Sequence, residues 1–178
     1  MRKSIFVPIL TILCAALLLF GLNFGLKNVT QANAQQEKLT IMQTILPDSK
    51  TFTEEAYTGE DTNIRTVYKA ENGYVVETVT AGYAGDITML IGVSNEGTVT
   101  GLVVREMSET FGLGANALND HVFLSQFLNT SGDAAVGTNV DAISGATVTS
   151  KAITRCVNSA VAFVTGADTE SGATSWGG

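Results

Sequence analysis

The sequence predicts an α+β protein with an N-terminal transmembrane helix, followed by a domain in which an antiparallel sheet packs on helices. Three features of the 178 residues indicate this class. Four strand-like segments with two turn signals occupy residues 65–105, an amphipathic pattern of helical period occupies residues 150–164, and an apolar run occupies residues 5–26. Strands collected in one part of a chain and helices in another favour a sheet with helices on it over alternating βαβ units.

The apolar run over residues 5–26 predicts a membrane anchor at residues 1–26. Asn23 is its only strongly polar residue, and at about 1.5 Å per residue the run is long enough to cross about 30 Å of hydrocarbon. Arg2 and Lys3 precede the run and favour a cytoplasmic N-terminus. We therefore expect a single-pass protein of the cell (inner) membrane, in contact with lipid, whose C-terminal domain is extracytoplasmic.

A cleaved signal peptide is the alternative interpretation of the same run. Ala32-Asn33-Ala34 fits a small-residue cleavage site. The run is, however, longer than the usual apolar core of such signals, which has about 7–15 residues. The membrane anchor is therefore the favoured interpretation.

Composition divides the rest of the chain into a linker at 27–36, a domain at 37–165 and a flexible tail at 166–178. Within the domain, apolar residues at helical spacing predict a helix over residues 39–46, which ends at a proline. The acidic and turn-rich segment 48–61 is expected to be a loop.

Two hairpins make up the predicted sheet. Asn72-Gly73 and Asn95-Glu96-Gly97 are turn signals that separate strand-like runs. The expected strands cover residues 65–70, 74–81, 87–94 and 99–105.

Two helices and the loops before them complete the predicted domain. A loop with two glycines follows the last strand, a helix is expected over residues 120–128, and a second loop covers residues 132–141. Residues 150–164 predict an amphipathic helix with Thr149 or Ser150 as its N-cap. Its apolar positions are 152, 153, 156, 157, 160, 161 and 164.

The types of residue present argue against several kinds of site. His121 is the only histidine and is expected at the surface of its short helix, and the sequence contains no HExxH, no CxxC and no Ser/His/Asp set. Cys14 lies in the apolar run and Cys156 on a helix face expected to be buried, so neither a disulfide framework nor a metal site is expected. We expect no catalytic residues and no metal ligands.

The charge of the chain argues against nucleic acid as a partner. Beyond residue 36 the sequence has 17 Asp and Glu residues and 7 Lys and Arg residues, a formal charge of −10. A surface of this sign repels phosphate backbones and anionic membrane surfaces.

Residues 144–149, which precede the amphipathic helix, form the candidate binding feature. Unpaired backbone N–H groups and the positive end of the helix dipole attract anions such as phosphate at this position. Gly145 and Ala146 let a ligand approach the backbone closely, while Lys151 and Arg155 add positive charge to the same helix. From these residues alone, a well-capped helix and a phosphate site both remain open.

Two motifs resemble those of the FMN-binding domain family. Ser144-Gly145-Ala146-Thr147-Val148-Thr149-Ser150, with Asp141 three residues upstream, is similar to the family's S(T)GAT-x-T-S motif. Glu109-Thr110-Phe111-Gly112-Leu113-Gly114 is similar to its E-T-P-G-L-G segment, with phenylalanine where proline is usual. The resemblance implies that FMN is bound covalently, its phosphate esterified to a motif threonine by a dedicated flavin transferase.

By this resemblance the residue that carries FMN is Thr147, with Thr149 as the second candidate. The other expected cofactor-binding residues come from the rest of the motif and from the glycine-rich loop, which would form the second wall of the flavin site. These are Ser144, Gly145, Ala146, Thr149, Ser150, Glu109, Thr110, Gly112, Leu113 and Gly114. The tail repeats SGAT at residues 171–174, but no amphipathic helix follows it, so a second flavin there is the less favoured interpretation.

The order of the elements resembles that of the G subunits of Rnf complexes. This resemblance implies an electron-carrier component of a membrane-bound ferredoxin:NAD⁺ oxidoreductase that is coupled to Na⁺ or H⁺ translocation. The implied partners are the A, D and E proteins of the complex in the membrane, its B and C proteins on the cytoplasmic side, and the flavin transferase. The alternatives are the C component of a sodium-translocating NADH:quinone reductase, an anchored covalent-FMN protein of extracellular electron transfer, and a binding module without redox chemistry.

Overall fold

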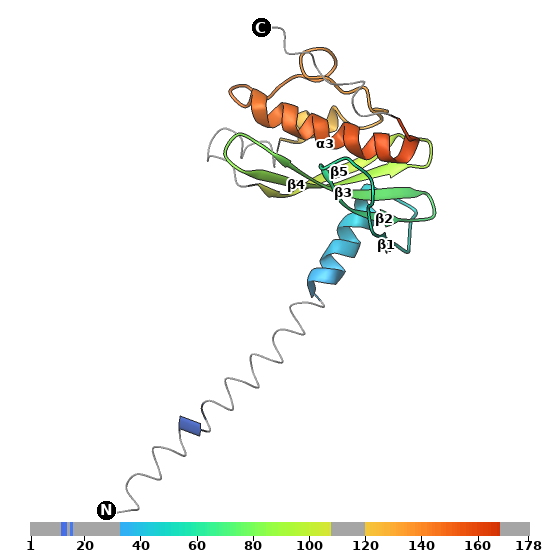
Figure 1. Ribbon diagram of the computed structural model, residues 1–178, viewed down its shortest axis with the longest axis vertical. Helices are drawn as coiled ribbons and strands as arrows, with labels where there is room; N and C mark the ends of the chain where they lie inside the picture. The colour runs from blue at the N-terminus through green and yellow to red at the C-terminus, as the bar shows by residue number, and fades with distance from the viewer. Residues whose placement is uncertain (1–11, 14, 16–32, 108–119, 168–178) are drawn as a thin grey trace, which may run out of the picture. The chain divides into compact units, whose positions relative to one another are not determined.

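The computed structural model describes residues 12, 13, 15, 33–107 and 120–167 (Figure 1). The chain divides into two compact units, residues 1–40 and residues 41–178. Nearly all of the predicted anchor over residues 1–26 lies outside the described residues. Among the residues that are described, no helix combines the length and the apolar character needed to span a membrane.

Residues 33–40 of the first unit are helical, and so are residues 41–45 at the start of the second. The predicted helix over residues 39–46 is therefore present, but the last four residues of the predicted linker, 33–36, are helical as well. Ala34 and the two glutamines after it have high intrinsic helix propensity. Their polar composition alone did not indicate a helix.

The sheet of the second unit has five strands in the order β1-β2-β3-β4-β5, and each strand is antiparallel to its neighbour. The strands are β1 Thr53–Glu55, β2 Ile64–Lys69, β3 Gly73–Ala81, β4 Asp86–Ser94 and β5 Val99–Met107. The two predicted hairpins are confirmed. The prediction of a loop throughout residues 48–61 was wrong at β1, whose three residues are all exposed and therefore carry no alternating apolar pattern.

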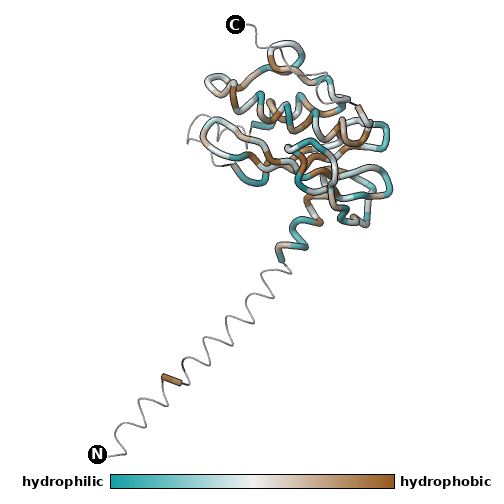
Figure 2. Tube along the Cα trace, viewed as in Figure 1, coloured by the Kyte–Doolittle hydropathy of each residue, from teal (hydrophilic) through white to brown (hydrophobic). Residues whose placement is uncertain are grey.

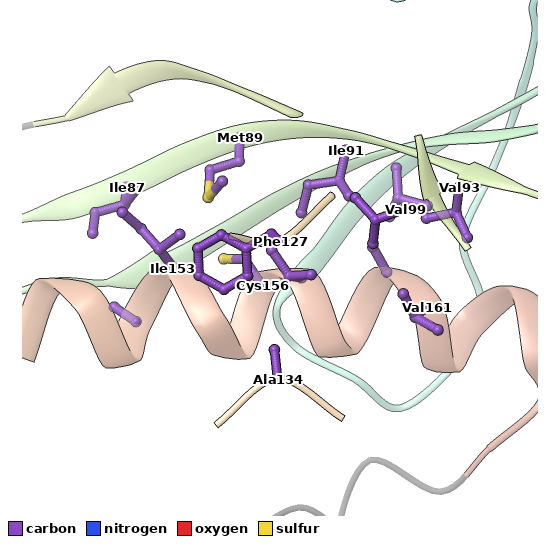
Figure 3. Close-up of a cluster of buried hydrophobic side chains, with 14 of the residues drawn as sticks. Ile87, Met89, Ile91, Val93, Val99, Phe127, Ala134, Ile153, Cys156 and Val161 are labelled. Atoms are coloured by element: carbon purple, nitrogen blue, oxygen red, sulfur yellow. The ribbon is translucent and has the colours of Figure 1, made fainter. Parts of the chain in front are cut away.

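The helix α3, Thr147–Thr165, lies across one face of this sheet (Figure 1). Alternate residues of β4 point toward it, because successive side chains of a strand face opposite sides; Figure 3 shows Ile87, Met89, Ile91 and Val93 directed at α3. Hydrophobic and hydrophilic stretches follow one another along α3 (Figure 2). An amphipathic helix has its apolar residues every three or four positions, so that they form one face. The helix ends at Gly166, which has the left-handed conformation (φ 68°) typical of a C-terminal cap.

The opposite face of the sheet is covered by residues 42–46. Gly92 in β4 and Gly101 in β5 are cross-strand partners, and the backbone of Ile45 lies directly against both of them. The hydroxyl group of Thr100 donates a hydrogen bond to the Ile45 carbonyl oxygen. The pair of glycines thus permits a close approach that buries Met42, Ile45 and Leu46.

Substitution of Gly101 by alanine is expected to destabilise the domain. An added Cβ would lie 2.7 Å from Ile45 Cα and 2.8 Å from its carbonyl oxygen, and both of these are backbone atoms. We expect Gly101→Ala to lower the free energy of unfolding by about 1–3 kcal/mol, the usual cost of overpacking, as measured by urea denaturation. Glu54→Ala on the exposed strand β1 is the control, with a change of at most about 0.5 kcal/mol. Equal stability of the two variants would contradict the close packing.

Candidate functional site

The helix α3 begins at Thr147, three residues before the predicted start, and Ala146 is its N-cap. The prediction of Thr149 or Ser150 as the N-cap was therefore wrong, because both residues already lie in the first turn. Ala146 makes no side-chain cap hydrogen bond, and the first turn contains no acidic residue. The first backbone N–H groups of a helix have no partner within the helix, so this end of α3 is suited to an anion.

The residues just before α3 form a tight turn. The Ala146 N–H donates to the Ile143 carbonyl oxygen at 2.9 Å, and Gly145 at the third position of the turn has a φ of 77°. A positive φ at this position is typical of a type II turn and favours glycine. Ser144 and Gly145 are exposed at the corner of this turn.

Ser150 holds this turn against the helix. Its hydroxyl group accepts a hydrogen bond from the Ile143 N–H at 3.0 Å and donates one to the Ala146 carbonyl oxygen at 2.9 Å. The side chain is completely buried. Ser150 therefore shapes the loop from inside the protein.

Ser150→Ala is expected to lower the free energy of unfolding by about 1–3 kcal/mol, because it leaves the part-buried Ile143 N–H without its acceptor. Chemical denaturation of the purified chain measures the change. Ser144→Ala, at the exposed corner of the same turn, is the matched control and is expected to change stability by no more than about 0.5 kcal/mol. A Ser150→Ala variant as stable as Ser144→Ala would show that the hydroxyl group does not hold the turn.

The two candidate threonines lie in different environments. Thr147 is exposed at the first position of α3, and its neighbour Val148 is half exposed. Thr149 is buried, with 1% of its surface accessible. Only one of the two threonine side chains is therefore at the surface, and it is the one that the resemblance favoured.

The two basic residues of α3 do not surround the turn. Arg155 Nη2 lies 3.5 Å from the Ala81 carbonyl oxygen at the end of β3, and its position is about 12 Å along the helix from Thr147. Lys151 is partly buried one turn into the helix. Neither basic residue lies in the first turn of α3, where the backbone N–H groups supply positive potential.

The helix α2, His121–Ser125, precedes this region in the chain and is shorter than the predicted 120–128. Asp120 is its N-cap and accepts a hydrogen bond from the Phe123 N–H at 2.9 Å. His121 is exposed, as predicted. The expected second wall of the site, Glu109, Thr110, Gly112, Leu113 and Gly114, lies outside the described residues, and so does the second SGAT at 171–174.

One contact next to the motif was not indicated by the sequence. Gln126, directly after α2, bonds through its side-chain amide to both backbone groups of Asp141. Contacts between a side chain and a backbone 15 residues away leave no periodic pattern in a sequence. Only the tertiary structure brings these residues together.

Outside the turn, the described residues include neither a reactive thiol nor a cluster of metal ligands. Burial raises the pKa of the Cys156 thiol to about 11, so the thiol stays neutral and unreactive at ordinary pH. A pocket of about 260 Å³ lies near Tyr57 and Phe163, toward the C-terminal end of α3 and away from the turn. In the described ranges, no group of three or more His, Cys, Asp or Glu side chains is placed to bind a metal ion.

Comparison with known proteins identifies the domain around the turn. Residues 82–162 match the FMN-binding domain family, and this span contains β4, β5, α2, the turn and most of α3. The features of the turn fit the phosphate group of such a cofactor: an exposed hydroxyl group, a glycine corner and a helix N-terminus without an acidic residue. The domain is therefore an α+β flavin-binding domain whose cofactor is FMN.

Three curated relatives, all G subunits of ion-translocating complexes, are similar over longer segments. The one from the Na⁺-translocating ferredoxin:NAD⁺ oxidoreductase complex of Acetobacterium woodii is 40% identical over 100 residues, which are 50% of this chain and 47% of the relative. Its counterpart from the proton-translocating complex of Clostridium ljungdahlii is 39% identical over 110 residues, 55% and 59% of the two chains. The third is from the ion-translocating oxidoreductase complex of Methanosarcina acetivorans. It is 37% identical over 150 residues, which are 75% of this chain and 77% of the relative.

The chain belongs to the family of G subunits of ion-translocating oxidoreductase (Rnf) complexes. It spans about half the length of the first of these relatives and under two thirds of the second. Among solved structures, NqrC of Shewanella oneidensis is similar, with 25% identity, a TM-score of 0.45 and coverage of 66% of this chain and 65% of that one.

Proposed function

We propose that this chain carries FMN in a phosphoester bond to Thr147. The observation that carries the proposal is the position of the Thr147 side chain, exposed at the start of α3 beside a turn free of acidic groups. A phosphodiester keeps one negative charge, which the positive end of the helix stabilises. The buried Thr149 would require the helix to open before its hydroxyl group could react.

Attachment requires an activated flavin phosphate as donor and a flavin transferase as catalyst. The bond between Thr147 Oγ and phosphorus forms as the bond from phosphorus to the leaving group breaks, and the transferase accepts the hydroxyl proton. The first turn of α3 has no carboxylate and the thiol of Cys156 is buried, so neither of these supplies the base.

We further propose that the chain is an electron carrier within a membrane-bound ferredoxin:NAD⁺ oxidoreductase that translocates Na⁺ or H⁺. The names of the relatives from Acetobacterium woodii and Clostridium ljungdahlii support this proposal. The partners would be the other Rnf proteins: A, D and E in the membrane, and B and C on the cytoplasmic side. An anchor within residues 1–26 would place the FMN-binding domain on the extracytoplasmic side of the cell membrane.

The bound flavin supplies the electron-transfer chemistry, and the protein tunes and orients it. This chain's own residues would hold the phosphate end at the turn, with Gly145 leaving room at the corner and Ser150 fixing the loop. A covalent bond keeps the cofactor in place outside the cytoplasm, where no pool of FMN replaces a molecule that dissociates.

The test uses the full chain co-expressed with a flavin transferase and with the other proteins of the complex. Intact mass spectrometry is expected to give the mass of the chain plus one FMN. Membranes that contain this chain are expected to reduce NAD⁺ with reduced ferredoxin, and membranes without it are not. If the chain is flavinylated but its removal leaves this activity unchanged, the covalent FMN stands and the role in the complex is overturned.

A further inference from the structure

The side chain of Gln126 forms a reciprocal pair of hydrogen bonds with the backbone of Asp141. Its Nε2 donates to the Asp141 carbonyl oxygen at 3.3 Å, and its Oε1 accepts from the Asp141 N–H at 2.8 Å. Both backbone groups of Asp141 are therefore satisfied by one side chain, which takes the place of a neighbouring strand. A primary amide suits this role because it carries a donor and an acceptor side by side without a charge.

Gln126 is attached to a rigid part of the core. Its backbone N–H donates to the Phe123 carbonyl oxygen at 3.2 Å, and Phe123 and Phe127 on either side of it are both buried. The two rings pack edge to face with their centroids 5.2 Å apart, and Phe127 lies between the sheet and α3 (Figure 3). The amide group is thus presented from a fixed position.

The segment that Gln126 holds is the approach to the attachment site. Asp141 lies two residues before Ile143, whose N–H is held by Ser150. The residues between and after these two held positions are exposed: Ala142, Ser144, Gly145 and Thr147. The loop is therefore an exposed surface segment that is held at two points, by Gln126 at Asp141 and by Ser150 at Ile143.

We propose that Gln126 is a positioning residue for flavin attachment, holding residues 141–145 in the conformation that the transferase binds. The inference rests on the proposed function of Thr147. An enzyme that modifies an exposed loop binds one conformation of it, and its apparent affinity falls in proportion to the fraction of molecules that have this conformation. Gln126 raises that fraction without touching the reacting atoms.

The first test measures the loop without flavin. In the Thr147→Val background, Gln126→Ala is expected to speed amide hydrogen exchange in peptides covering residues 139–146 about tenfold, the factor for a net loss of about one hydrogen bond. Exchange in α3 beyond residue 152 should stay unchanged. Ser125→Ala, one position earlier, is the matched control, because its hydroxyl group bonds within the helix, to the Val122 carbonyl oxygen. Unchanged exchange at residues 139–146 would overturn the inference.

The second test measures flavin transfer to the full chain. Gln126→Ala is expected to raise the KM of the transferase for this protein by up to about tenfold with kcat within about twofold, since only the fraction of molecules in the bound conformation changes. Gln126→Glu keeps the acceptor and loses the donor, so an intermediate KM is expected. An unchanged KM in Gln126→Ala, together with a flavinylated wild type, overturns the inference alone. A wild-type chain that accepts no flavin overturns the proposed function as well, so flavinylation of the wild type distinguishes the two outcomes.

Discussion

Thr147→Val is expected to abolish covalent flavin attachment, so that the band of this variant in a denaturing gel shows no flavin fluorescence. Valine replaces the hydroxyl group with a methyl group of similar size, and the exposed position at the start of α3 tolerates it. Co-expression with the flavin transferase, followed by in-gel fluorescence and intact mass spectrometry, measures the loss. The expected effect is complete because no bond to phosphorus forms without the hydroxyl oxygen.

Two further threonine variants serve as controls for this result. Thr149→Val changes a buried side chain two residues away and is expected to retain the flavin. Thr174→Val removes the hydroxyl group of the second SGAT and is expected to retain most of the fluorescence. If Thr147→Val remains fluorescent while Thr149→Val is dark, the attachment residue is Thr149. If only Thr174→Val is dark, the flavin is in the tail.

Phe127→Ala is expected to lower the free energy of unfolding by about 3–5 kcal/mol, as for other fully buried aromatic side chains. Phe127 is fully buried and belongs to the same core cluster as residues of the sheet and of α3 (Figure 3). The residue also follows Gln126, so the loss of its packing removes the support of the Asp141 contact. Since a domain has a total stability of about 5–15 kcal/mol, the variant is expected to lose a large share of its stability.

Urea denaturation followed by circular dichroism measures this change. The neighbouring Leu128 is 41% exposed, and Leu128→Ala is the matched control, expected to cost less than about 1 kcal/mol. Phe127→Leu, which retains most of the apolar volume, is expected to lie between the two. Equal stabilities of the Phe127 and Leu128 alanine variants would contradict the position of Phe127 in the core.

Local patterns predicted much of the fold. The Asn-Gly and Asn-Glu-Gly turn signals between strand-like runs predicted the two hairpins, because these residues favour the tight turns that join antiparallel strands. The apolar spacing from residue 152 onward predicted α3 in the same way. Strand β1 has no such signal, since its three residues are exposed and it forms by pairing with the edge of β2. The start of α3 was also misplaced, because the small residues before Ser150 fit a turn and a helix equally well.

The same distinction applies to the candidate site: some of its features follow from local sequence patterns and others from contacts between distant segments. The motif, the threonine that the resemblance favoured and the amphipathic helix that follows it can all be read from the order of the residues. The exposure of Thr147 and the burial of Thr149 became visible only in the folded protein. The same is true of the contacts by which Ser150 and Gln126 hold the loop. Burial and long-range hydrogen bonds depend on which segments meet in space. No local residue pattern carries that information, whereas helix period and turn chemistry are properties of neighbouring residues.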